Sequence, residues 1–209
     1  MKDRKIAAQE KITQHDKRKI KTCRQLVKAL CELTREKPLY RITVQELSAA
    51  AGVSRGTFYL HFSDIFDMYE KLEADVLENI SAWFQEYLAE FTDEAYKRFL
   101  VNVVGYVDAD RDLFRLLFSM TGFRKQLTAI LDDFYLETWK KFHGQDMSIK
   151  LRESLLFYHT HGILACVDRW LNEEPAASKE ELLELLNLLD ESFDELTEKK
   201  RLQPSGDQV

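Results

Sequence analysis

The chain has 209 residues, of which 45% are hydrophobic and 32% are charged, a composition typical of a globular protein with a sizeable core. Its 7 glycines and 3 prolines are too few for an all-β fold, and they form no glycine-rich phosphate-binding loop. The 3 cysteines form no CxxC pair, so we expect free thiols and a cytoplasmic location. No apolar run suggests a membrane span or a secretory signal.

Charge is distributed unevenly along the chain. Residues 1–62 carry 14 Lys and Arg against 6 Asp and Glu, a net charge of +8, whereas residues 63–209 carry a net charge of −14. Because a polyanion responds to the local field rather than to the total charge, the first segment is the candidate for contact with nucleic acid.

Helical periodicity extends over nearly the whole sequence and predicts an all-α fold of about nine helices, with a three-helix N-terminal unit and a larger helical body. Pro38 ends the first helix, because proline lacks the backbone N–H that a helix interior needs. The predicted helices, with their caps, cover residues 17–37, 43–52, 54–60, 63–91, 92–107, 111–120, 124–142, 148–172 and 179–198.

Residues 43–62 read TVQELSAAAGVSRGTFYLHF and predict two short helices that meet at a glycine turn. Thr43 and Glu46 have the spacing of a capping box, Gly52 tolerates a left-handed turn, and Ser54 suits the next N-cap. This is the pattern of a helix-turn-helix, whose second helix enters the DNA major groove. The candidate DNA-binding residues all carry hydrogen-bonding groups: Thr43, Ser54, Arg55, Thr57, Tyr59 and His61.

The run AGVSRGTFYLHF, residues 51–62, resembles the signature of the TetR family of transcriptional regulators, and the resemblance covers residues 17–70. It implies a homodimer that forms through the last two helices, a palindromic DNA operator, and most often a repressor released by an effector. It implies no enzymatic activity and no cofactor. Residues 161–186 resemble the C-terminal domain of regulators of the dihydroxyacetone-kinase-operon type, in which some members act through a protein partner.

The resemblance suggests four segments along the chain. They are a flexible basic arm at 1–16, a helix-turn-helix domain at 17–62, an effector-binding and dimerisation domain at 63–198, and a disordered tail at 199–209. The effector is a small molecule or, alternatively, a protein partner. A third interpretation is a helical enzyme or carrier that retains a vestigial DNA-binding head. His159 and His161 are two positions apart on a helix and point in different directions, so no metal site is expected.

Two sets of residues in the body are candidates for function. Aromatic and polar residues of the middle helices are candidates for the partial lining of an enclosed, mostly apolar cavity, and the absence of any cavity above roughly 300 Å³ would disfavour a small-molecule effector: Tyr106, Phe114, Phe118, Phe134, Trp139, Phe157 and His161. Apolar stripes on the last two helices are expected to pack across a two-fold axis: Leu155, Tyr158, Gly162, Cys166, Trp170, Leu182, Leu185, Leu186, Leu189 and Phe193. Gly162 in mid-helix suggests a close approach of two helices there.

Overall fold

The computed structural model describes residues 14–143, 148–173 and 177–202. Within these ranges the chain forms nine α-helices, one short 3-10 helix and no strand, which confirms the all-α prediction. None of the described helices is both long and apolar enough to cross a membrane. By its internal contacts the chain divides into two compact units, residues 1–72 and 73–209. The predicted arm and tail fall largely outside the described residues.

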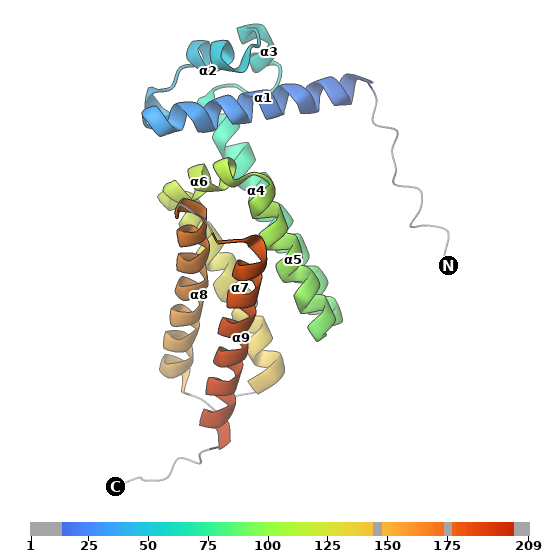
Figure 1. The fold of residues 1–209 in the computed structure, drawn as a ribbon, viewed down its shortest axis with the longest axis vertical. Coiled ribbons are helices and arrows are strands. Elements are labelled where there is room, and N and C mark those ends of the chain that lie inside the picture. The colour runs from blue at the N-terminus through green and yellow to red at the C-terminus, as the bar shows by residue number, and fades with distance from the viewer. Residues whose placement is uncertain (1–13, 144–147, 174–176, 203–209) are drawn as a thin grey trace, which may run out of the picture. The chain divides into compact units, whose positions relative to one another are not determined.

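The first unit consists of α1 (Gln14–Glu36), the 3-10 helix η1 (Leu39–Arg41), α2 (Val44–Ala51), α3 (Arg55–Tyr59) and the start of α4 (Ile65–Glu90), as Figure 1 shows. These helices share an apolar core. Each large side chain that is fully buried in it stabilises the fold by roughly 1.5–3 kcal/mol. The core residues with no exposed surface are Leu26, Leu30, Leu47, Phe58 and Met68.

Side-chain caps define the ends of the two short helices. The Thr43 hydroxyl accepts a hydrogen bond from the Glu46 N–H at 3.2 Å, and the Glu46 carboxylate accepts one from the Thr43 N–H at 3.0 Å. Gly52 ends α2 with φ +66°, a left-handed conformation that costs a glycine little. The Ser54 hydroxyl accepts a hydrogen bond from the Thr57 N–H at 3.0 Å. The predicted capping box and turn are therefore confirmed.

The second unit contains the rest of α4 together with α5 (Asp93–Ala109), α6 (Arg111–Ser119), α7 (Thr121–His143), α8 (Ile149–Asn172) and α9 (Lys179–Leu202). Helix α8 lies beside α9 and contacts both α6 and α7 (Figure 1). Helix α9 extends beyond its predicted end at residue 198 and reaches Leu202.

The centre of the second unit is a stack of aromatic rings. The ring of Phe84 on α4 lies 4.5 Å from that of Phe99 on α5 and 4.0 Å from that of Phe134 on α7, and the last two are 5.7 Å apart, as measured between centroids. Stacked and tilted rings at such distances contribute packing energy beyond their buried area. This cluster joins the consecutive helices α4 and α5 to α7.

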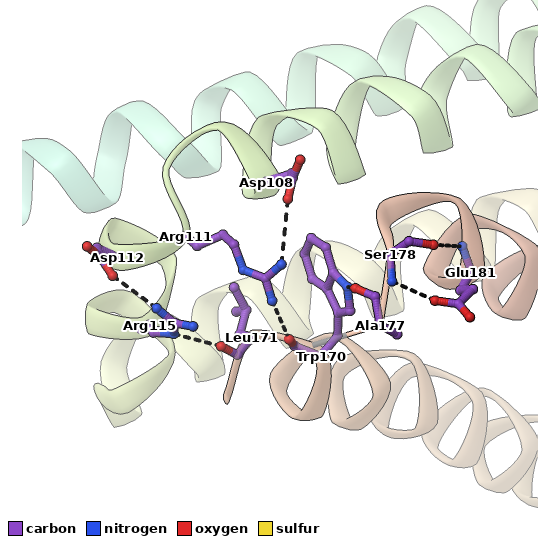
Figure 2. A network of polar contacts seen from close by, with 9 residues as sticks. All are labelled: Asp108, Arg111, Asp112, Arg115, Trp170, Leu171, Ala177, Ser178 and Glu181. Carbon is purple, nitrogen blue, oxygen red and sulfur yellow. Dashed lines mark hydrogen bonds and ion pairs between the residues drawn. The ribbon is translucent and has the colours of Figure 1, made fainter. Parts of the chain in front are cut away.

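Two arginines of α6 hold the end of α8, as Figure 2 shows. The Arg111 guanidinium donates a hydrogen bond to the Trp170 carbonyl and lies 4.0 Å from the centre of the Trp170 ring. Arg115 donates to the Leu171 carbonyl at 2.6 Å. The Trp170 indole N–H in turn donates to the Ala177 carbonyl at 2.7 Å. The last carbonyls of a helix lack partners within the helix, so the two arginines satisfy carbonyls at the end of α8, and the Trp170 indole connects this end to Ala177, just before α9.

Candidate functional site

Helix α3 has polar side chains on its outer side, and its inner side packs against the core of the first unit. Phe58 is fully buried, and its ring meets that of Tyr59 edge to face at 5.5 Å. Arg55 is exposed, and Tyr59 is 51% exposed. A guanidinium and a phenol are therefore held at the surface on a short helix that Phe58 fixes to the core. Both groups suit contacts with DNA bases or phosphates.

The hydroxyl residues of the predicted DNA-binding set also have local structural roles. The hydroxyls of Ser54 and Thr57 are 2.8 Å apart and bond to each other at the start of α3. The Thr43 hydroxyl contacts the Glu46 carboxylate at 2.9 Å. Lys37 lies 2.6 Å from the same carboxylate, and its hydrogen bond is the main cause that lowers the pKa of Glu46 to about 2.

His61 follows α3 and is half-buried. Its backbone carbonyl accepts a hydrogen bond from Lys71 at 3.4 Å, and Lys71 also pairs with Asp67 at 2.9 Å. These contacts connect the end of the helix-turn-helix to the first turns of α4. The structure thus places all six predicted DNA-binding residues on or next to α2 and α3.

The second unit contains two adjoining cavities that share Tyr135 and Asp190. The apolar cavity, of about 70 Å³, includes Phe114 and Phe118 of the predicted effector set in its lining. The aromatic cavity, of about 100 Å³, includes Phe134 and Trp139 of the same set. Neither cavity reaches the roughly 300 Å³ at which pockets for drug-sized ligands begin, and these four predicted residues are divided between the two linings.

The other three residues of the predicted effector set line neither cavity. Tyr106 packs edge to face against Phe114 and accepts a hydrogen bond from Asn79. Phe157 is 61% exposed, and its ring stacks on that of His161 at 3.9 Å on the outside of α8. Sequence reasoning missed Tyr87, Tyr96, Tyr135 and Asp190, which do line a cavity. These residues lie on several helices and come together only when the helices pack, so the sequence offers no signal that separates them from ordinary core residues.

The predicted dimer set also needs correction. Four of its members are buried within their own protomer, so these side chains do not form an exposed stripe: Trp170, Leu182, Leu186 and Phe193. Tyr158 and Leu185 are exposed, while the remaining four are half-buried: Leu155, Gly162, Cys166 and Leu189. A Cβ added at Gly162 would meet no atom within 4 Å, so none of the other described helices of the chain approaches it closely.

The fold and the capped helix pair define a helix-turn-helix protein. Residues 26–72 match the family model of the bacterial regulatory proteins of the TetR family. The match covers the helix-turn-helix and the start of α4, so the DNA-binding unit is similar to that of TetR-family regulators. Members of this family are transcriptional regulators and not enzymes.

Similar proteins include regulators of the same type. The chain is 26% identical over 159 residues to an uncharacterised HTH-type transcriptional regulator, YxbF of Bacillus subtilis (strain 168); the match covers 75% of this chain and 41% of YxbF, so the chain spans less than half of that relative. A TetR-family regulator from Syntrophomonas wolfei has a similar fold, with a TM-score of 0.58 at 18% identity and coverage of 91% and 100% of the two chains. The dihydroxyacetone kinase operon activator DhaS matches with a TM-score of 0.51 at 21% identity, over 84% and 97%.

Proposed function

We propose that the protein is a cytoplasmic, homodimeric repressor that binds a palindromic operator and is released by an effector in its second unit. The observation that carries this proposal is the exposed pair Arg55 and Tyr59 on α3, which Phe58 anchors within a helix-turn-helix of the TetR type. Two such helices in a two-fold dimer would enter successive major grooves. An effector would act by binding one shape of the dimer more tightly than the other.

Selection of bound duplexes from a random DNA pool tests this function. We expect the full-length protein to enrich a palindrome whose half-sites are about one helical turn apart. Binding should weaken steeply with salt, because affinity for phosphates depends on the release of counterions. Recovery of no palindrome at low salt would contradict the proposal.

Exposed apolar side chains on the last two helices support the dimer. Phe157 and Tyr158 on α8 are 61% and 73% exposed, and Leu185 and Leu188 on the adjacent α9 are 41% and 53% exposed. Large apolar side chains grouped on two neighbouring helices are typical of a protein–protein interface. The four buried residues of the predicted dimer set would pack beneath this surface within each protomer.

Introducing a charge into this surface should separate the protomers. We expect Leu188→Glu to shift the protein from dimer to monomer at micromolar concentration in light scattering, because an unpaired carboxylate is costly to bury. Val101→Glu is the matched control, since Val101 is 49% exposed on α5 and lies outside this surface. A monomeric wild-type protein, or dissociation by both variants alike, would contradict the assignment.

A protein partner as the effector is the second candidate. The two cavities, of about 70 Å³ and 100 Å³, are smaller than the roughly 300 Å³ at which pockets for drug-sized ligands begin. This size disfavours a large metabolite and leaves two options, a small ligand or a protein that binds the outer surface. Release of the operator by a low-molecular-weight extract fraction would favour the small ligand.

A further inference from the structure

The aromatic cavity has a lining that differs from an ordinary apolar core. It lies among α4, α5, α7, α8 and α9, and rings surround it from four of these helices while two carboxylates face it. The full lining is Tyr87, Asp93, Tyr96, Phe134, Tyr135, Thr138, Trp139, His159, Asp190 and Phe193.

The rings form a continuous wall. Tyr87 lies 5.4 Å from Tyr96 and 5.7 Å from Phe134, as measured between ring centroids. On the other side, Phe193 lies 6.2 Å from Trp139 and stacks at 4.1 Å on His159. The face of an aromatic ring carries negative charge density, so a group surrounded by such faces is stabilised when it is positive.

The charged groups of the lining act in the same direction. Asp190 accepts hydrogen bonds from His159 at 2.7 Å and from Tyr135 at 3.4 Å, while Asp93 is exposed at the rim. Burial lowers the pKa of His159 to about 4, so the imidazole is neutral at pH 7 and donates to the Asp190 carboxylate. The described lining therefore carries negative charge and would repel an anionic ligand.

No lysine or arginine is among the described lining residues. Lys141, close in sequence to Trp139, donates to the Leu88 carbonyl at 2.5 Å and lies 4.3 Å from the centre of the Phe91 ring. Its ammonium group is thus held at the end of α4, outside the lining. The N-terminus of α5 brings a partial positive charge near the rim, which the Asp93 carboxylate offsets.

We propose that the aromatic cavity binds a small organic cation of the quaternary ammonium class. Aromatic walls with nearby carboxylates are the recurrent means of binding such cations, which cannot donate conventional hydrogen bonds. The cavity is small, about 100 Å³, which limits the bound part of the ligand to a compact group such as trimethylammonium.

The cation would be the effector only if the proposed function holds, whereas its binding to the cavity does not depend on that function. Asp190, Tyr135 and His159 belong to α9, α7 and α8, so a ligand beside them contacts helices that also carry the proposed dimer surface. Binding of the cation and binding of the operator are separate measurements. Loss of one does not depend on the outcome of the other.

Calorimetric titration of the full-length protein with choline tests the inference. The matched control ligand is the uncharged carbon analogue of choline, in which a tert-butyl group replaces the trimethylammonium group. We expect saturable binding of choline and at least about tenfold weaker binding of the analogue, because only the cation gains from ring faces and carboxylates. Equal binding of both ligands, or no binding of choline and of tetramethylammonium, would overturn it.

Variants at the rim locate the site. We expect Tyr96→Leu to weaken choline binding about tenfold, whereas Tyr96→Phe retains the ring and the affinity. Asp93→Asn should weaken binding several-fold, and Glu94→Gln, which changes a neighbouring exposed carboxylate outside the lining, should not. Melting curves verify that each variant is folded. Equal affinities for all four variants and the wild-type chain would place the bound cation elsewhere.

Discussion

Replacing Arg55 by alanine should weaken binding to the selected operator by about 1–3 kcal/mol per contact, or roughly 5- to 150-fold, and relax the preference at one base pair. The reason is geometric, because a guanidinium matches the two acceptors of guanine in the major groove, and Arg55 is exposed at the first position of α3. Competition between operator variants in a gel-shift titration measures both the loss of affinity and the loss of preference.

Tyr59→Phe is the companion measurement, since it removes only a hydroxyl from the same short helix. If that hydroxyl holds a phosphate, binding should weaken equally for every operator sequence. The ring contact with Phe58 survives in this variant, which keeps the helix in place. An altered sequence preference in Tyr59→Phe, together with an intact one in Arg55→Ala, would reverse the roles of the two residues.

Acidification should destabilise the protein through His159. Burial lowers the pKa of this imidazole from 6.5 to about 4 in the folded chain, so the unfolded chain takes up a proton first as the pH falls. The contribution of neutral His159 is complete above pH 6.5 and is lost progressively towards pH 4. Between pH 6.5 and pH 5 we expect a loss on the order of 2 kcal/mol in the free energy of unfolding, measured by urea denaturation.

Two variants separate this effect from general acid denaturation. His159→Gln cannot titrate and should flatten the pH dependence over this window, whereas His161→Gln changes an exposed ring on the same helix and should leave it unchanged. The groups that face His159 from α7 and α9 are Tyr135 and Asp190. The Asp190 carboxylate favours the protonated imidazole and moderates the loss. An unchanged slope in His159→Gln would contradict the assignment.

Local signals in the sequence predicted the DNA-binding unit accurately. The capping box at Thr43, the left-handed turn at Gly52 and the cap at Ser54 depend on residues within four positions of one another. Such interactions are encoded by neighbouring side chains, so a single sequence reveals them. The same holds for the order of the helices, because amphipathic periodicity repeats along each helix.

The body was harder to predict because apolar residues on one helix look alike whether they face a core, a cavity or a partner. Leu182 and Leu185 belong to the same predicted stripe, yet the first is 3% exposed and the second 41%. Trp170 was expected at the dimer surface, and the structure buries it beneath Arg111. Neither outcome follows from spacing on one helix, since each depends on which helix packs alongside.

The sequence alone therefore determined the helical fold and the helix-turn-helix, because these follow from caps, turns and periodicity over short distances. Only the tertiary structure decided how the body uses its aromatic residues. It brings Tyr87, Trp139, His159 and Asp190 from four helices around one small cavity, and it leaves Phe157 and His161 on the surface. Contacts between residues on different helices depend on how whole helices pack, and the periodicity of one helix carries no information about them.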